Sequence, residues 1–501
     1  DAQLSRGLGD VYKRQLIEEN IPVYIKNTFD QDADGTCISN STKLDEDEVV
    51  KGISHIENIS IINFEGSGMV GVPGFSKRFF ESLSNYKINV VMITQASSEF
   101  SICIAVNSDD AKLAKQVIDK EFEFEISQKR INKAQIENNL SNIAIVGDKM
   151  KSKKGISGKL FSSLGHNNIN IRAIAQGASE RNISIIIDKK NTSKALNSLH
   201  ETFFEDNLKD IHIFITGVGN VGGYLMEQIN VQKKFIAQNL KLNLKVLGIS
   251  NSKRMVISDS EIDLNNWVKL LDESNLKADF NVFQDKILEL NLRNSLFVDN
   301  TASEVIPSTY SKYLKNGVGI ITCNKIANSV EYSNYELLKS LSRNNNSPFF
   351  YETNVGAALP VISTLNNLIN SGDKIIKIEA VLSGTLNYIF NSFKEPDTFH
   401  DIVSKAVDLG FTEPDPKIDL CGIDVSRKIL ILARESGYNI EFDDVKKNHF
   451  LPISSINTKT KDDFLLSLKE NSNHFNKLLN EAKKRNCRLK FVAKLNEGKA
   501  S

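Results

Sequence analysis

The 501-residue sequence predicts several α/β and α+β domains in one chain, because three observations each indicate a different folded unit. The segment 61–106 returns in altered form at 142–187, a constant shift of 81 positions. A strand-like run leads into a G-x-G-x-x-G motif at 217–222, and carboxylates gather before a lysine at 413–428. We therefore expect tandem ferredoxin-like domains, then a Rossmann doubly wound domain, then an α+β substrate and dimerisation domain.

The composition argues against some classes of main partner and leaves a local basic patch as the open alternative. The 62 Lys and Arg balance the 62 Asp and Glu, whereas nucleic acids and anionic membranes are bound through clustered basic side chains. No apolar run reaches the roughly 18 residues that a membrane span needs. The five cysteines are far apart and lack metal-site spacing, which favours a reducing, cytoplasmic compartment.

The repeat predicts two copies of one domain. Gly66 aligns with Gly147, and Gln95 with Gln176, without a gap between them. Each copy has an apolar strand, a Gly-containing loop, an amphipathic helix, two further strands and a second helix, which is the ferredoxin-like order. The expected strands are 59–64, 88–94 and 101–106 in the first copy and 143–146, 169–175 and 183–188 in the second, with second helices at 110–121 and 192–203.

The loop after the first strand of each copy is a candidate amino-acid site. Its backbone N–H groups could meet a carboxylate, and Gln95 or Gln176 offers both a donor and an acceptor. For one copy alone, the commoner explanation is a tight turn beside a surface glutamine.

The sequence IHIFITGVGNVGGYLM at 211–226 predicts a dinucleotide site. Gly217 makes the turn, Gly219 permits close approach of the pyrophosphate, and Gly222 lets the following helix pack on the strand. The helix N-terminus then faces the phosphate charge. The candidate cofactor loop comprises Gly217, Val218, Gly219, Asn220, Val221 and Gly222.

The next strand, 245–250, leads to Lys253 and Arg254 at the place where NAD-binding proteins carry a carboxylate. A 2′-phosphate could be met there, so NADP is favoured over NAD, with a basic surface loop as the ordinary alternative. Strands at 295–299 and 319–322 should end beside the cofactor, which places Thr301 and Lys325 there.

The acidic cluster at 413–428 is the candidate catalytic centre. Asp424 and Lys428 are four residues apart and share one helix face, although most such pairs are solvated salt bridges. Glu413, Asp415 and Asp419 crowd the same approach and would suit a substrate ammonium group. A lysine partly desolvated among them could transfer a hydroxyl proton while hydride leaves the carbon.

These motifs jointly resemble one family. GSGMVGVPG, ITQASSEFSI, IVGDKM and IAQGASERNI resemble the paired ACT regulatory domains of bifunctional aspartokinase/homoserine dehydrogenases, and EPDPKIDLCGIDVSRK at 413–428 resembles their dehydrogenase motif. Residues 21–36 are similar to the tail of the kinase region, whose phosphate-binding loops we do not find. The resemblance implies reduction of aspartate semialdehyde to homoserine with NADPH, in threonine and methionine biosynthesis, by a homo-oligomer whose ACT edges pair between subunits.

The resemblance also implies residue roles. Lys428 would be the acid/base with Asp424 lining the pocket, and Lys325 would lie on the cofactor side. Substrate would be bound by Glu413, Asp419 and Thr385, and threonine, the expected inhibitor, by Gln95 and Gln176. A sodium ion would be held by Glu352, Val355, Ala357 and Leu359, and 383–388 would be a substrate-domain strand.

We expect five segments along the chain. They are a kinase remnant at 1–54, of which 1–15 is a candidate foreign sequence, ACT domains at 55–130 and 131–208, a NAD(P)-binding domain at 209–345, and a truncated substrate domain at 346–501. The run 488–495 looks like a strand with nothing after it to pair against, so we interpret the chain as a fragment. Two rival hypotheses are a non-catalytic amino-acid sensor on a dinucleotide-binding scaffold and an NADP-linked dehydrogenase for another amino alcohol.

Overall fold

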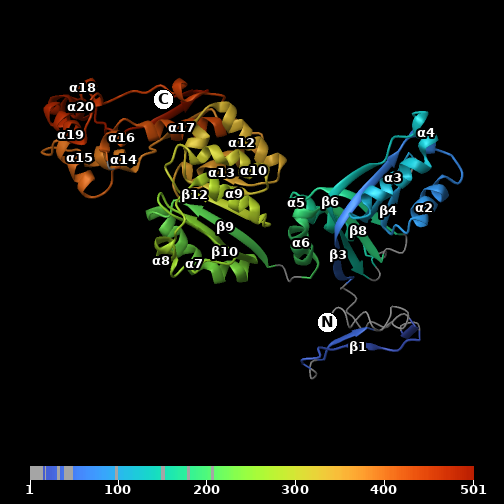
Figure 1. The fold of residues 1–501 in the computed structure, drawn as a ribbon. Coiled ribbons are helices and arrows are strands. Elements are labelled where there is room, and N and C mark those ends of the chain that lie inside the picture. Colours follow the sequence, from blue (N-terminus) through green and yellow to red (C-terminus); the bar gives the residue numbers. More distant parts are fainter. Residues whose placement is uncertain are drawn as a thin grey trace. The chain divides into compact units, whose positions relative to one another are not determined.

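The computed structural model of the chain describes residues 15–16, 19–30, 34–38, 49–95, 100–147, 150, 153–177, 181–204, 208–413 and 415–501. Almost all of the candidate foreign segment, and the repeat residues Ser98, Glu99, Ser179 and Glu180, lie outside these ranges. The chain divides into two compact units, Asp1–Gly158 with Ile171–Lys189 and Lys159–Asn170 with Lys190–Ser501. Figure 1 labels their helices and strands.

An antiparallel six-stranded sheet is the centre of the first unit, in the order β4-β5-β3-β6-β8-β7. Every strand predicted from the repeat is present, and the first strand of each copy is longer than predicted. The strands are β3 (Val50–Glu65), β4 (Val90–Gln95), β5 (Ser101–Asn107), β6 (Gln135–Gly147), β7 (Ile171–Gln176) and β8 (Asn182–Asp188). A separate hairpin, β1 (Val23–Ile25) with β2 (Thr36–Ile38), precedes them.

β3 and β6 are long because each of them serves both copies of the repeat. The second half of β3 pairs with β5 on one side and with the start of β6 on the other, as in the facing pair Ile62 and Ile136. The first half of β3 pairs with the end of β6, which also pairs with β8, as in the facing pair Ile53 and Ile145. Each copy therefore completes its sheet with a strand from outside its own repeat.

The aligned glycines Gly66 and Gly147 allow this exchange. A Cβ at Gly66 would lie 2.5 Å from the carbonyl oxygen of Arg130, and a Cβ at Gly147 would lie 2.2 Å from that of Val49. Val49 and Arg130 are themselves 81 positions apart, so the repeat extends into the segments that enter the shared strands. These two glycines are needed for close backbone packing.

Two predicted helices and one short helix accompany the first copy. They are α2 (Phe75–Asn85), α3 (Ala111–Glu121) and α4 (Glu123–Ser127). Aromatic rings fill the space between helices and strands, with Phe75 and Phe122 stacked at 4.6 Å between centroids and Phe64 at 5.1 Å from Phe122. This cluster is one apolar core of the unit.

The second unit contains the predicted doubly wound sheet, in the order β11-β10-β9-β12-β13-β14. Its strands are parallel except for β11, which pairs antiparallel with β10 at the edge. The strands are β9 (Lys209–Thr216), β10 (Leu242–Ser250), β11 (Met255–Ile257), β12 (Ser295–Asp299), β13 (Gly319–Thr322) and β14 (Phe349–Phe350). Helices α7 (Asn220–Leu240), α8 (Trp267–Glu273), α9 (Phe280–Leu290), α10 (Tyr310–Lys315), α11 (Ile326–Ser329) and α12 (Tyr332–Asn344) alternate with them.

The C-terminal part of the second unit is mainly helical around a three-stranded antiparallel sheet of β15 (Lys377–Ala380), β16 (Ala493–Asn496) and β17 (Lys499–Ala500). Its helices are α13 (Val361–Asn370), α14 (Gly384–Ser392), α15 (Phe399–Asp408), α16 (Pro416–Leu420), α17 (Ile423–Glu435), α18 (Ile453–Ile456), α19 (Lys461–Glu470) and α20 (Ser472–Lys484). Among the described residues, no helix is both long enough and apolar enough to span a bilayer.

Two strand predictions in this region are wrong. Residues 383–388 begin helix α14, because the Ser383 side chain accepts from the N–H of Leu386 and caps the helix. The run 488–495 is extended into a strand only from Ala493, and β16 does have partners, since it pairs with β17 and with β15, far upstream. The pairing with β15 crosses more than a hundred residues and leaves no local signal, whereas β17 follows β16 directly after a turn at Glu497 and Gly498.

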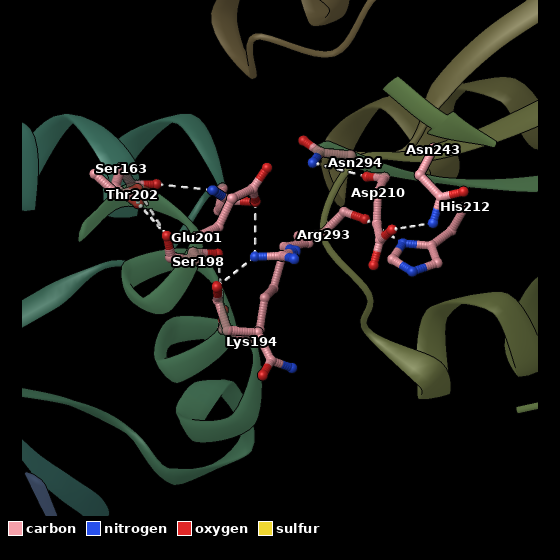
Figure 2. A network of polar contacts seen from close by, with 12 residues as sticks. Ser163, Lys194, Ser198, Glu201, Thr202, Asp210, His212, Asn243, Arg293 and Asn294 are labelled. Carbon is pink, nitrogen blue, oxygen red and sulfur yellow. Dashed lines mark hydrogen bonds and ion pairs between the residues drawn. The ribbon is translucent and has the colours of Figure 1, made fainter. Parts of the chain in front are cut away.

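Helix α6 (Thr192–Phe204), with most of α5 (Ile156–His166), belongs to the second unit. Figure 2 shows α6 against the loop between α9 and β12. Arg293 of that loop forms an ion pair with Glu201 at 2.7 Å, and the two side chains are only 9% and 11% exposed. Arg293 also donates to the Asn197 carbonyl, and its own carbonyl oxygen lies 2.7 Å from His212 Nδ1 on β9. The helix that follows β8 is thus fixed to the parallel sheet through a buried ion pair.

Candidate active site and cofactor site

The glycine turn after β9 has the geometry that a dinucleotide requires. Gly217 has φ +87°, and a Cβ there would lie 2.7 Å from the Thr301 side chain. A Cβ at Gly222 would lie 2.1 Å from the Gly217 carbonyl oxygen, so α7 can pack on the turn only through a glycine. Among the described atoms, none lies within 4 Å of a Cβ built at Gly219, so this position faces open space. Asn220, Val221 and the buried Val218 complete the turn into α7.

The surroundings of this turn fit a bound dinucleotide. The Asn300 side-chain nitrogen beside it is buried and has no hydrogen-bond partner among the described residues. Lys253 and Arg254 are exposed in the β10–β11 hairpin, where their backbone N–H groups both donate to Asn251 Oδ1 at 2.7 Å. The Gly217 N–H donates to the Ser250 carbonyl at 2.8 Å, so this hairpin starts beside the glycine turn. When bound, such a cofactor supplies or accepts a hydride.

A buried carboxylate that the sequence analysis missed organises the ends of β12 and β13. Asp299 is fully buried and accepts from the Thr301 N–H at 2.8 Å, from the Tyr310 hydroxyl at 2.6 Å and from Asn324 Nδ2 at 3.2 Å. Burial, together with the charge of Asp299, raises the pKa of Tyr310 well above its ordinary value, so this hydroxyl remains a donor. Asp299 therefore fixes the loops that carry Thr301 and Lys325.

Asp424 lies between two lysines from different parts of the unit. Lys428 Nζ is 2.7 Å from its Oδ2, and Lys325 Nζ, from the loop after β13, is 3.3 Å from its Oδ1. The Lys428 ammonium also donates to the Leu382 carbonyl at 2.8 Å, and its side chain is 17% exposed. Burial alone would raise the pKa of Asp424, but Lys325 and Lys428 outweigh it and lower that pKa below its ordinary value.

The other acidic residues divide into two roles. Asp419 Oδ2 accepts from the backbone N–H of Glu413 at 2.8 Å, while the Asp415 side chain caps α16 by accepting from the Lys417 N–H at 3.0 Å. Burial is the main cause that raises the pKa of Asp419, and the charges of Glu413 and Asp424 add to it against hydrogen bonds from the Glu413 N–H and Thr385. Thr385 Oγ1 lies 2.6 Å from the Phe411 carbonyl oxygen, so its single hydroxyl proton is shared between this carbonyl and Asp419. Asp419 and Thr385 therefore lie together, whereas Glu413 is exposed and meets Asp419 through its backbone.

The predicted cation loop precedes α13. Both carboxylate oxygens of Glu352 accept backbone N–H groups of α13, from Ile362 at 2.8 Å and from Ser363 at 2.9 Å. Val355 is buried, Leu359 is exposed, and Ala357 has φ +51°. In the described part of the chain no three His, Cys, Asp or Glu residues cluster as metal ligands, so a cation here would depend on one carboxylate and backbone carbonyls. Such oxygen donors fit a hard cation.

Gln95 and Gln176, the two predicted effector residues, each lie at the end of a strand. Gln95, at the end of β4, lines a cavity of about 240 Å³ with the start of α2, namely Gly74, Phe75, Ser76 and Lys77, and with Met69 and Val72. The N–H groups of Gly66 and Gly68 do not serve it, since they donate to Phe100 and Arg130 carbonyls. Gln176 is exposed at the end of β7, and its neighbours 178–180 lie outside the described residues.

Three family profiles match successive parts of the chain. The ACT domain profile matches residues 62–122 and 143–203, the NAD binding domain of homoserine dehydrogenase matches 217–352, and the homoserine dehydrogenase profile matches 360–501. A crystal structure of a Candida auris protein of unknown function is 31% identical, with a TM-score of 0.53, and the match covers 58% of this chain and 82% of that one.

Curated relatives carry the same domains. The chain is 38% identical to a bifunctional aspartokinase/homoserine dehydrogenase of Haemophilus influenzae over 97% of this chain and 59% of the relative. It is 40% identical to a chloroplastic one of Arabidopsis thaliana over 87% of this chain and 48% of the relative. It thus spans about half the length of these bifunctional relatives, but 77% of a Schizosaccharomyces pombe homoserine dehydrogenase, at 34% identity over 56% of this chain. The chain therefore belongs to the homoserine dehydrogenase family and carries the ACT domains found in the bifunctional aspartokinase/homoserine dehydrogenases.

Proposed function

We propose that this chain is the ACT and homoserine dehydrogenase portion of a bifunctional aspartokinase/homoserine dehydrogenase, and that it interconverts aspartate semialdehyde and homoserine with NADP(H). The observation that supports this best is the Lys325–Asp424–Lys428 array, which joins the end of β13 to the first turns of α17. The carboxyl ends of parallel strands are where doubly wound sheets bind cofactor and substrate.

Lys428 is the proton donor in this proposal. An ammonium group has three N–H donors, and two of them are taken by Asp424 and the Leu382 carbonyl. The third N–H is left for the aldehyde oxygen of the substrate. As a hydride reaches the aldehyde carbon, that oxygen takes the proton, the product is an alcohol, and Lys428 is left neutral until solvent reprotonates it.

Asp424 and Lys325 keep this proton in place. Asp424 stays ionised to a lower pH than an ordinary carboxylate because two lysines face it. It therefore holds the Lys428 ammonium in one orientation through the pH range in which the enzyme would work. Glu413 would contact the substrate ammonium group, and Asp419 and Thr385 would also bind the substrate, as the family resemblance implies.

Threonine is the proposed effector. In the first copy its carboxylate would meet the N-terminus of α2, at Ser76 and Lys77, because the glycine-loop N–H groups are already used. Gln95 would bind the opposite end of the ligand. Gln176 would act in the second copy, and subunits would pair through the edges of their ACT domains.

Cofactor preference, a bound cation and the domain limits are proposed as well. NADP is favoured over NAD by Lys253 and Arg254, and a sodium ion is proposed for the loop from Glu352 to Leu359. The boundaries near residues 54, 130, 208 and 345 stand as proposed domain limits. A reducing, cytoplasmic compartment is also proposed, on the basis of the five widely spaced cysteines.

The test is homoserine-dependent NADP⁺ reduction, followed by the absorbance of the reduced nicotinamide. Lys428→Met should lower kcat by about 10²–10⁴-fold, the usual contribution of a general acid/base, with NADPH affinity unchanged. Lys417→Met is the matched control, because Lys417 Nζ also donates to a backbone carbonyl, that of Thr458 at 2.6 Å. Unchanged turnover in Lys428→Met would remove its assigned role. Threonine and NADPH binding without any homoserine oxidation would instead favour the non-catalytic sensor.

A further inference from the structure

We propose that Arg434 and Glu435, at the C-terminal end of α17, are positioning residues that fix Lys428 and Asp424 against Lys325. We call these two residues, with their partners Asn328, Tyr335, Lys339 and Tyr351, the clamp. This inference rests on the proposed function, because it concerns the same lysine.

Glu435 ties the end of α17 to α12 and to the residue after β14. Its side chain is 0% exposed, and it accepts from the Tyr335 hydroxyl at 2.7 Å and the Tyr351 hydroxyl at 2.6 Å. Lys339 Nζ lies 3.1 Å from its other oxygen. Burial, together with the charge of Glu435, raises the pKa of both tyrosines far above the ordinary value, so both hydroxyls stay protonated donors. Because the buried Glu435 carboxylate accepts from three donors, its position relative to α12 and Tyr351 is fixed.

Arg434 ties the same helix end to the segment that carries Lys325. Its side chain is 0% exposed, and its Nη1 donates to the Asn328 carbonyl at 3.0 Å. Asn328 lies in α11, which begins directly after Lys325. The Asn328 side chain donates to Asn354 at 3.0 Å, and Asn354 donates to the Thr322 carbonyl at 3.1 Å, at the end of β13.

Two partners of the clamp are close in sequence to proposed functional residues. Asn328 follows Lys325, while Tyr351 directly precedes Glu352 of the proposed cation loop. One helix therefore carries the proton donor at its start and bonds at its end to the segments of the cofactor lysine and the cation loop. Replacement of buried charges by well-packed apolar residues is often neutral or stabilising, which favours a positioning role for the buried side chains of Arg434 and Glu435.

Because α17 is long, a small rotation at the clamp produces a large displacement at Asp424. Asp424 and Glu435 are separated by about 16 Å at the helical rise of about 1.5 Å per residue. A rotation of about 5° at the clamp would then move Asp424 by about 1.5 Å, and displacements of about 1 Å can lower a rate by about 10²-fold. The clamp thus acts on catalysis without touching substrate or cofactor.

The pH dependence of kcat/KM should show whether the clamp holds Asp424 between Lys325 and Lys428. Asp424 is faced by Lys325 and Lys428 and, from α16, by the negative charge of Asp419. If the clamp loosens, the two lysines move away and the pKa of Asp424 rises toward its ordinary value. The acid limb of kcat/KM should then move to higher pH, which a general loss of stability would not cause.

The test compares Tyr351→Phe and Glu435→Gln with Tyr438→Phe in the full chain. Tyr438 lies in the loop after the same helix end, but its hydroxyl donates to the Ile375 carbonyl at 2.8 Å, within the substrate domain. We expect both clamp variants to lose at least about tenfold in kcat, to keep KM for NADP⁺ within about twofold, and to move the acid limb upward. Tyr438→Phe should leave all three unchanged.

The outcomes separate the clamp from the proposed function. Wild-type and Lys428→Met activities are measured first, and if the wild type oxidises no homoserine, both proposals fall. If those two behave as expected while folded clamp variants keep wild-type kcat and the same acid limb, only the clamp is overturned. Should Glu435→Gln fail to fold, Tyr351→Phe still decides, because it leaves Glu435 with the donors of Tyr335 and Lys339.

Discussion

Lys325 Nζ lies 3.3 Å from Asp424 Oδ1, so a residue that follows a strand of the dinucleotide-binding sheet is ion-paired with the first turn of a substrate-domain helix. Lys428 holds the other oxygen of Asp424 at 2.7 Å. The carboxylate between the two ammonium groups makes the proposed active site dependent on both the loop after β13 and the start of α17.

Asp419→Asn should stabilise the protein at neutral pH while it weakens substrate binding. Burial, with the charges of Glu413 and Asp424, raises the pKa of Asp419, so ionisation of this side chain costs stability once the pH exceeds its folded pKa. Thermal unfolding at about pH 7 should occur at a higher temperature in the variant, and the difference should shrink as the pH falls toward the ordinary Asp value of 3.8. The KM for homoserine should rise about tenfold, which is about 1.4 kcal/mol. A variant less stable than wild type at about pH 7 would contradict the assigned environment.

Lys253→Ala and Arg254→Ala should each raise the KM for NADP⁺ by about tenfold and leave that for NAD⁺ unchanged, because only NADP⁺ carries the 2′-phosphate. The control is Lys245→Ala, a lysine on β10 that pairs with Asp210 at 2.7 Å at the amino end of the sheet. Steady-state kinetics with NADP⁺ and with NAD⁺ measure the two KM values in each variant. Equal losses for the two cofactors would show that the hairpin has another role.

Gln95→Ala should weaken threonine inhibition by about tenfold without a change in uninhibited kcat, because its amide lines the cavity at the start of α2. Gln135→Ala is the matched control, since Gln135 is an exposed glutamine of the same sheet, at the start of β6. Inhibition curves and calorimetric titration with threonine measure the effect. If Gln95→Ala and Gln135→Ala are inhibited alike, the cavity is not the effector site.

Arg293→Met should destabilise the second unit by about 3–5 kcal/mol, because it removes one side of the buried Arg293–Glu201 ion pair. The double variant Arg293→Met with Glu201→Leu should recover most of that loss. Lys286→Met is the control, since the Lys286–Glu289 pair on α9 is exposed and worth about 0–1 kcal/mol. Urea unfolding followed by Trp267 fluorescence measures all three, and equal losses for Arg293→Met and Lys286→Met would contradict the buried pair.

Replacement of sodium by tetramethylammonium should lower both kcat and the unfolding temperature, because the larger ion cannot enter a site built from carbonyl oxygens and one carboxylate. Glu352→Gln should be insensitive to this exchange. The Glu352 carboxylate also caps α13, so this variant loses some stability in either salt, and only the difference between salts reports the cation. A wild-type protein indifferent to the exchange would count against the cation site.

The sequence predicted the folded units well where the signal is local. The apolar run 211–216, the spacing of Gly217, Gly219 and Gly222, and the repeat at a fixed shift each lie within one short segment, and each corresponds to an observed element. The pairing of Asp424 with Lys428 is equally local, since both project from one face of α17.

Features that depend on distant partners were not predictable. Asp299 is a buried acid at a strand end, and nothing near it in the sequence shows that Tyr310 and Asn324 complete its hydrogen bonds. Glu435 and Arg434 look like the polar end of an amphipathic helix, yet both are buried against residues about a hundred positions upstream. The strand at 383–388 was expected from the family resemblance and is wrong, because the Ser383 side chain caps a helix that begins at Gly384.

The shared strands also limit how the regulatory part can be re-engineered. β3 and β6 run through both halves of the duplication, so a cut between the halves would remove a backbone ladder from each remaining piece. A graft of these ACT domains onto another enzyme must therefore include both copies and begin before Val50. A version with only one copy of the repeat would expose an unpaired edge of β3 or β6, and exposed strand edges promote aggregation.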